Sequence, residues 1–297
     1  MTYSQPAGPW RFGLLLLGNT ALALGPLFVR LADTGPVAAG FWRLALALPL
    51  IALLAWREGG AAKLPERIVL WLALAAGVAF GLDVASWHLG IEMTRIGNST
   101  VFGNSGSVIV IGWGLLLARR APYNSEMLAI LTALVGAGLL MSGSLEISTN
   151  NFIGDLFCIL AGLLYAVYIL LLRHVRGKMG SWRLLLVSSI AATPTLLACA
   201  LLLGEVIMPR DWTPLLLLSF CSQIVGQGIL VWALGWFRPL VIGLALLTQP
   251  AVAALSGWIA FGETLSAGDV LGMALMATAL VIARVAEPKE PKVPAGI

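Results

Sequence analysis

Residues 87–90 of this 297-residue chain read Trp-His-Leu-Gly, and residues 232–235 read Trp-Ala-Leu-Gly. An earlier pair repeats in the same order, with Trp42-Arg43-Leu44 followed 140 residues later by Trp182-Arg183-Leu184. The apolar blocks around these matches also recur, five in each half of the chain. Because five is an odd number of membrane crossings, the second half would enter the membrane upside down relative to the first. Inverted repeats of this kind are typical of secondary transporters, which hold substrate near the midplane between the halves.

The composition places the chain in a lipid bilayer. Its residues are 59% hydrophobic and 11% charged, with a mean hydropathy of +0.94, whereas soluble domains average roughly 25% charged residues. Ten apolar blocks each approach the roughly 20 residues that a helix needs to cross the hydrocarbon core. Backbone groups in lipid must be satisfied within a segment, so each block is predicted to be a helix. The blocks are 10–31, 37–56, 68–90, 97–118, 126–144, 152–172, 182–204, 212–234, 240–261 and 267–286.

The predicted fold is therefore all-α and integral to the membrane, with ten transmembrane helices in two inverted five-helix repeats around a central cavity. Residues 1–146 are predicted to form the first repeat and residues 147–286 the second. Residues 287–297, in which prolines alternate with charges, are predicted to be a disordered cytoplasmic tail.

The positive charges predict the orientation of the chain. Fourteen of the 18 Lys and Arg residues fall on the side of the N-terminus, and the other four are Arg30, Arg43, Arg95 and Arg210. Positive residues favour the cytoplasm, so both termini are predicted to be cytoplasmic. The net charge of +4 follows from this asymmetry, and no nucleic-acid partner is expected. The expected partners are the lipid bilayer and a small-molecule substrate, with a monomer as the simplest assembly.

Polar side chains inside the apolar blocks are the strongest functional signal, because they are costly in hydrocarbon unless they have partners. Asp83 lies beyond the middle of the third block, with Trp87 one turn further along the same face. His88 is rotated off that face and lies closer to the surface. The predicted substrate-binding residues are Asp83, Trp87, Asn104, Ser105, Tyr165, Gln223, Gln227, Thr248, Gln249 and Asn19.

These polar residues come from blocks one, three, four, six, eight and nine, which we expect to surround the cavity. The second, fifth, seventh and tenth blocks are expected to face lipid. On this basis the cavity would contain no Lys or Arg, which disfavours a di-anionic substrate such as a sugar phosphate. The three cysteines fit no metal motif, so neither a metal nor another cofactor is expected.

Structural roles are alternatives for each of these residues. Asp83 could hydrogen-bond a neighbouring helix, and the Asn, Ser and Thr residues could bind backbone carbonyls. The repeated tryptophans could anchor the helices at the membrane interface.

Ten helices in two five-helix repeats resemble the drug/metabolite transporter superfamily, and in particular its bacterial EamA-type branch. The stretch from Thr248-Gln249-Pro250 to Phe261-Gly262-Glu263 is similar to the end of that family's repeat. The first half lacks the corresponding proline and glutamate. The resemblance implies a bacterial inner-membrane protein and a secondary transporter that works by alternating access.

Within that branch the chain most resembles exporters of neutral and aromatic amino acids. A zwitterion needs a partner for its ammonium group, which Asp83 could supply. Its carboxylate needs donors, which could be Asn104, Ser105, Gln223 and Gln227. An apolar side chain would pack on Trp87 and Tyr165. Other solutes that the superfamily carries, such as amines, nucleosides or drugs, remain alternatives. Asp83 is the main candidate for proton coupling and His88 the second, and a purely facilitative carrier stays open.

Two other classes of protein are disfavoured. A channel would need a continuous polar path or a filter sequence, and neither is present. An intramembrane enzyme would need a recognisable catalytic motif. Asp83 and Asp155 lack the sequence around them that an aspartyl protease would show. The chain is therefore predicted to have no enzyme activity.

Overall fold

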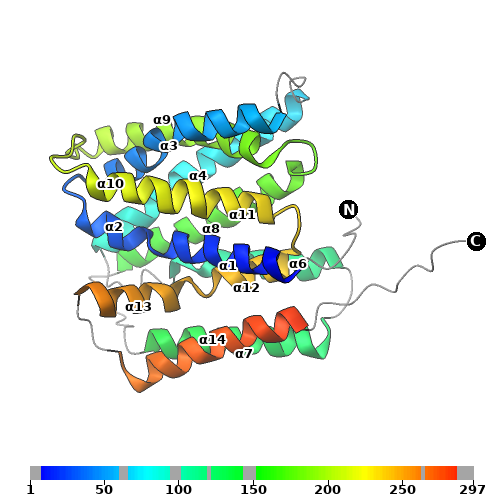
Figure 1. The fold of residues 1–297 in the computed structure, drawn as a ribbon. Helices are drawn as coiled ribbons and strands as arrows, with labels where there is room; N and C mark the ends of the chain where they lie inside the picture. The colour runs from blue at the N-terminus through cyan, green and yellow to red at the C-terminus, as the bar shows by residue number, and fades with distance from the viewer. Residues whose placement is uncertain are drawn as a thin grey trace, which may run out of the picture.

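A computed structural model describes residues 8–59, 66–93, 102–118, 122–142, 152–261 and 265–285 of the chain. All regular secondary structure within these ranges is helical (Figure 1). The predicted tail at 287–297, the boundary between the repeats at 146–147, and Gly262-Glu263-Thr264 lie outside the described residues.

The helices follow the predicted apolar blocks closely. Their bounds are α1 (Pro9–Ala23), α2 (Gly25–Leu31), α3 (Pro36–Gly59), α4 (Arg67–Met93), α6 (Ser105–Ala118), α7 (Asn124–Ser142), α8 (Phe152–Val175), α9 (Ser181–Leu202), α10 (Thr213–Leu218), the π-helix η1 (Ser219–Gln227), α11 (Gly228–Ala233), α12 (Pro239–Leu246), α13 (Gln249–Phe261) and α14 (Ala267–Val285).

These helices form ten apolar spans, as predicted. Seven spans in the described ranges have the length and hydropathy needed to cross a membrane. Each of α1–α2, α10–η1–α11 and α12–α13 counts as one of them. The three shorter apolar helices are Ser105–Leu116, Asn124–Leu139 and Ala267–Ile282.

Three of the spans are interrupted near their middle, which hydropathy did not predict. Pro26 and Pro250 each occupy the second position of a new helix, where the missing N–H of proline costs no hydrogen bond. The eighth span changes to π-helix over Ser219–Gln227. Pro49 and Pro194, by contrast, lie inside α3 and α9 without ending them.

Helix packing shows the approximate two-fold relation between the halves. The second spans of the two halves, α3 and α9, pack together, and so do the fifth spans, α7 and α14. The pairing of α4 with α9 has its counterpart in α3 with η1. Likewise α4 packs on α8 as η1 packs on α1. These equivalences confirm the prediction of two inverted repeats.

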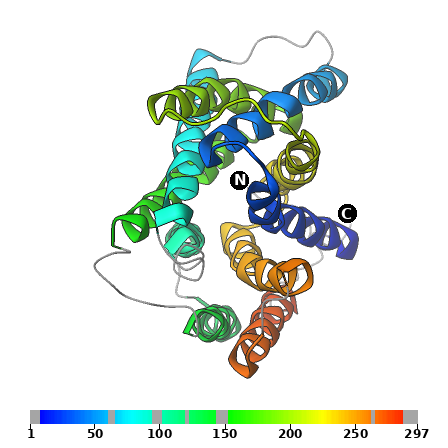
Figure 2. The ribbon, with the colours of Figure 1, turned by 90° about the vertical axis from the view of Figure 1, so that its left-hand side faces the viewer.

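The two ends of the chain and one peripheral pair of helices are visible in the ribbon views. The start of α1 and the end of α14 lie at the same end of the bundle (Figure 1). Helices α7 and α14 form a pair at one edge of the bundle (Figure 2) and join the rest mainly through α12 and α13. Their peripheral position agrees with the predicted lipid-facing role of the fifth and tenth blocks.

Glycines allow α4 to approach α9 closely. A Cβ atom on Gly77 would lie 2.1 Å from the Ser188 carbonyl oxygen, and one on Gly81 would lie 3.0 Å from the carbonyl oxygen of Ala192. Small residues four positions apart therefore bring the two backbones together. This contact fixes α4, the helix that carries Asp83.

Carboxylates tie α3 and α9 together at both ends. Glu58, near the end of α3, accepts hydrogen bonds from the backbone N–H groups of Ser181 and Trp182 at 2.7 and 2.8 Å. Glu205, which follows α9, accepts from the N–H groups of Val37 and Ala38 at 3.2 and 2.7 Å. Each carboxylate thus satisfies the free N–H groups at the start of the partner helix.

Glu205→Ala is expected to destabilise the fold, because it leaves the first N–H groups of α3 without their acceptor. We expect the free energy of unfolding to fall by about 0.5–2 kcal/mol. The measurement is the thermal midpoint of the purified protein in detergent. Glu66→Ala is the control, because its ion pair with Lys178 is exposed and such pairs contribute little. Equal losses in the two variants would contradict the capping role.

Candidate functional site

A cavity of about 120 Å³ lies between helices of both repeats. Sites for drug-sized ligands typically measure roughly 300–1,000 Å³, so this cavity suits a small solute. Six of the predicted residues line it: Asp83, Trp87, Asn104, Tyr165, Gln227 and Gln249. They come from α4, the turn before α6, α8, η1 and α13.

The other predicted residues do not line the cavity, but Asn19 and Thr248 support it. Asn19 in α1 is buried, and its Nδ2 donates to Thr248 Oγ1 at 2.7 Å. Its Oδ1 accepts a hydrogen bond from Gln249 Nε2 at 3.1 Å. The amide of Asn19 therefore bridges the interruption between α12 and α13 and orients Gln249 at the cavity wall.

Asn19→Leu is expected to release Gln249 and to leave Thr248 without its donor. Because a buried polar group that loses its partner costs about 1–3 kcal/mol, both the thermal midpoint and the affinity for transported solute should fall. Substrate KM and thermal unfolding of the purified protein are the measurements. Thr20→Ala is a suitable control, since Thr20 is the next residue but is exposed. A normal KM together with reduced stability would leave Asn19 with a purely structural role.

Ser105 and His88 lie against neighbouring helices. A Cβ atom on Gly162 of α8 would meet the Ser105 hydroxyl oxygen at 2.2 Å, which shows how closely α6 and α8 approach. His88 is 1% exposed, and its Nδ1 is hydrogen-bonded to the Pro36 carbonyl oxygen. It thereby joins α4 to the start of α3 and does not line the cavity.

Arg43 lines the cavity, and this corrects the expectation that the cavity lacks a cation. The residue lies in the second turn of α3, which was expected to face lipid, and it is 8% exposed. Its Nε donates to Gln223 Oε1 at 3.2 Å, and its Cζ lies 5.6 Å from the centre of the Phe80 ring. The expectation was wrong because hydropathy does not tell which face of α3 meets η1.

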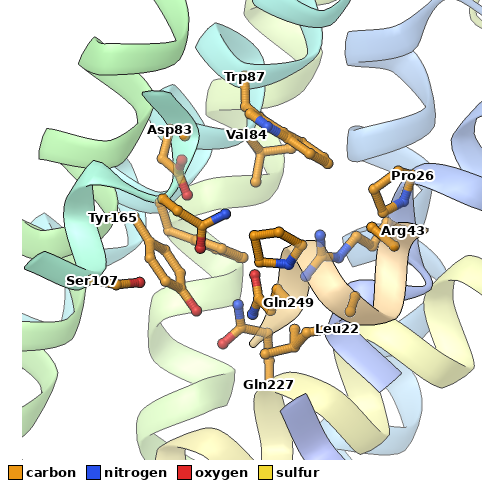
Figure 3. A pocket seen from close by; sticks show the side chains of 16 residues that line it. Leu22, Pro26, Arg43, Asp83, Val84, Trp87, Ser107, Tyr165, Gln227 and Gln249 are labelled. Atoms are coloured by element: carbon orange, nitrogen blue, oxygen red, sulfur yellow. The ribbon is translucent and has the colours of Figure 1, made fainter. Parts of the chain in front are cut away.

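A carboxyl group and a guanidinium group face each other across this cavity. Asp83 and Arg43 lie on opposite sides of it, with the amides of Gln227 and Gln249 between them (Figure 3). No ion pair within 4.0 Å joins Asp83 to Arg43, and within the described ranges no group donates a hydrogen bond to the Asp83 carboxylate. The cavity therefore presents a carboxyl group and a guanidinium group on opposite sides.

Aromatic side chains supply the apolar part of the wall. Trp87 covers one side of the cavity (Figure 3) and rests on Gly103, where a Cβ atom would lie 3.1 Å from its indole Nε1. Tyr165 and Phe80 line the cavity from α8 and α4. Tyr168 lies behind them, and its ring stacks on Phe80 with centroids 4.6 Å apart.

The bundle is packed closed at the end where α1 begins. Phe12 and Phe237 pack with ring centroids 6.4 Å apart, and Phe237 is 1% exposed. Every residue of α12 is buried. Arg238 forms a 2.9 Å ion pair with the buried Glu126 of α7. By contrast, Asp83 and Trp87 lie in the second half of α4, so the cavity lies nearer the opposite end.

The inverted repeats separate the two equivalent tryptophans. Trp87 lines the cavity, while Trp232 packs near the closed end with Trp10 and Trp236, at ring-centroid distances of 6.0 and 6.1 Å. The first tryptophan pair has packing roles. Trp42 donates to the Ile207 carbonyl oxygen at 2.6 Å, and Trp182 lies against Gly228.

Comparison with known proteins finds a match to one family over nearly the whole chain. The sequence pattern of the EamA-like transporter family matches twice, at residues 10–142 and 152–285. An uncharacterized transporter of Archaeoglobus fulgidus is 25% identical over 92% of this chain and 96% of its own length. The threonine/homoserine exporter RhtA of Escherichia coli is 26% identical over 86% of this chain and 85% of its own length.

A solved structure has the same fold. One crystal structure superposes with a TM-score of 0.71 over 93% of this chain and 96% of that chain, at 15% sequence identity. At this identity the likeness concerns the fold alone.

Proposed function

The chain belongs to the EamA-like transporter family, and from this premise we propose that it is a secondary transporter exporting small neutral amino acids, aromatic ones included, by alternating access. Its relatives are named transporters and exporters, and the chain is a multi-pass membrane transporter rather than an enzyme. We propose the substrate class, the alternating-access mechanism and the outward direction of transport.

The observation that carries this proposal is the placement of Asp83 and Arg43 on opposite sides of one cavity (Figure 3). An amino acid is a zwitterion, so it needs an anionic partner for its ammonium group and a cationic partner for its carboxylate. Guanidinium groups match carboxylate geometry and bind it through two parallel hydrogen bonds. Asp83 would bind the ammonium group, and the Gln227 and Gln249 amides would complete the polar wall.

The cavity wall and the relatives support a neutral side chain on the substrate. Phe80, Trp87 and Tyr165 form an apolar surface on which such a side chain can pack. The small cavity volume favours a substrate as small as a single amino acid. The Escherichia coli relative is named a threonine/homoserine exporter, which makes threonine the first solute to test.

In alternating access, the central cavity would open first at one end of the bundle and then at the other. The packed residues around Phe237 and α12 close one end of the bundle, and the cavity lies nearer the other end. We propose that both termini lie in the cytoplasm of a bacterial inner membrane, as the distribution of positive charge predicts. Arg43 is buried inside the bundle and no longer counts among the four cations assigned to the side away from the termini. The asymmetry of positive charge between the two sides therefore becomes larger. In this orientation the cavity would face outward, and Asp83 would be the group for proton coupling.

The test is uptake of labelled solutes into proteoliposomes, with and without a pH gradient. The panel contains threonine, phenylalanine, a sugar phosphate and a polyamine, and protein-free liposomes are the control. Saturable movement of threonine or phenylalanine, stimulated by excess unlabelled amino acid on the other side of the membrane, supports the proposal. Movement of the polyamine or sugar phosphate with none of either amino acid would contradict the substrate class. Single-channel currents would contradict the carrier mechanism.

A further inference from the structure

Gln223 occupies a position behind the cavity wall that the proposed function does not use. It lies in η1, it is 0% exposed, and it is not among the lining residues. Its Oε1 accepts the hydrogen bond from Arg43 Nε at 3.2 Å, while its Nε2 donates to Ser189 Oγ of α9, also at 3.2 Å. Both ends of the amide are therefore occupied, and they connect α3, η1 and α9.

Arg43 determines which way the Gln223 amide points, and Ser189 supports that orientation. Ser189 is 1% exposed and accepts a hydrogen bond from Nε2. With its nitrogen held there, the amide presents its oxygen to Arg43. An amide turned the other way would place N–H donors against the guanidinium, which has donors only.

This contact holds Arg43 from the side away from the cavity. Only its Nε has a hydrogen-bond partner within the part of the chain that the structure describes. The Phe80 ring supports the guanidinium from a second direction, with 5.6 Å between Cζ and the ring centre. The two Nη groups are left for a ligand, which is the arrangement that binds a carboxylate through two hydrogen bonds.

The hydrogen-bond partner of Arg43, Gln223, is neutral, so the positive charge of Arg43 is not cancelled within the protein. A carboxylate at position 223 would form an internal ion pair with Arg43 and cancel its charge, leaving Asp83 as the net charge of the cavity. An amide of nearly the same shape accepts the same hydrogen bond and leaves the guanidinium positive. A cation opposite a carboxylate favours solutes that carry both charges.

We propose that Gln223, held by Ser189, is a positioning residue that sets the charge selectivity of the transporter. It aims the Arg43 guanidinium into the cavity without neutralising it, so that solutes with a carboxylate are preferred over the corresponding amines. This inference rests on the proposed function, because it assumes that Arg43 binds the carboxylate of the substrate.

The test compares threonine with 1-aminopropan-2-ol, the amine that lacks only the carboxylate of threonine. Each solute is measured in proteoliposomes with wild-type protein, Gln223→Glu, Gln223→Leu and Ser189→Ala. The quantity of interest is the ratio of kcat/KM for threonine to kcat/KM for the amine. Thermal unfolding and gel filtration of each variant establish that it is folded.

Gln223→Glu is expected to lower kcat/KM for threonine by about tenfold or more, because the new ion pair competes with the substrate carboxylate. Transport of the amine should be retained or increased, so the ratio falls by at least the same factor as kcat/KM for threonine. Gln223→Leu keeps the Arg43 charge but loses its orientation. It should lower the ratio less than Gln223→Glu, and Ser189→Ala should lower it least.

Two results would overturn this inference, and they are distinguishable. If Gln223→Glu and Gln223→Leu reduce both solutes by the same factor, Gln223 only packs the interior, and the proposed function is unaffected. If the wild-type protein moves neither threonine nor phenylalanine, the proposed function fails, and the inference falls with it.

Discussion

Arg43→Gln is expected to remove most amino-acid transport while leaving the protein folded. The guanidinium is the only cationic side chain that lines the cavity among the described residues, so the substrate carboxylate would lose its charged partner. Hydrogen bonds to charged groups contribute about 1.5–3 kcal/mol, and each 1.4 kcal/mol is a factor of ten. The expected fall in kcat/KM for threonine is therefore about 10- to 150-fold.

Two further variants make this prediction specific. Arg43→Lys keeps the charge but loses the planar pair of donors, so its kcat/KM should lie between those of wild type and Arg43→Gln. Arg210→Gln removes an exposed arginine that lies outside the cavity, and it should transport normally. Wild-type kcat/KM in Arg43→Gln would refute the assignment of Arg43 to the carboxylate.

Asp83→Asn should reduce transport without reducing stability. Within the described ranges the Asp83 carboxylate accepts no hydrogen bond, so the substitution breaks no such contact in the fold. It also removes the cost of holding an unpaired charge inside the bundle. The thermal midpoint should stay the same or rise, while kcat/KM for amino acids falls by about tenfold or more, because the ammonium group loses a charged partner.

The stability of Asp83→Asn separates function from folding, because substitution of a residue needed only for packing would lower the thermal midpoint and transport together. If Asp83 also carries the coupled proton, uptake by the variant should lose its response to a pH gradient. Asp155→Asn is the matched control, since Asp155 is a buried aspartate in the first turn of α8 and does not line the cavity. Unchanged amino-acid uptake by Asp83→Asn at every pH would exclude Asp83 from binding and from coupling.

Local sequence predicted much of this architecture. The ten spans, the inverted repeat and six of the residues that line the cavity follow from hydropathy and from polar residues inside apolar blocks. This signal is reliable because the bilayer penalises each unsatisfied polar group wherever it lies along the chain. The interruptions of the helices were only partly predictable. Proline marks two of them, but the π-helix at Ser219–Gln227 has no comparable signal in the sequence.

The role of Arg43 could not be read from the sequence around it. Its neighbours in the second block are apolar, and its position near the end of a span resembles that of an interfacial charge. Its hydrogen-bond partner Gln223 lies 180 residues away, and Ser189 lies behind that amide. Asn19 is similar, because its partners Thr248 and Gln249 belong to the other half of the chain.

The sequence by itself thus determined that the chain crosses the membrane ten times in two inverted halves with polar residues toward the middle, since these properties depend on local hydropathy and on the parity of the spans. Only the tertiary structure decided which polar residues line the cavity and which ones support it. That division depends on which helix faces meet across the repeat interface, and the hydrogen bonds that settle it join residues more than 150 positions apart.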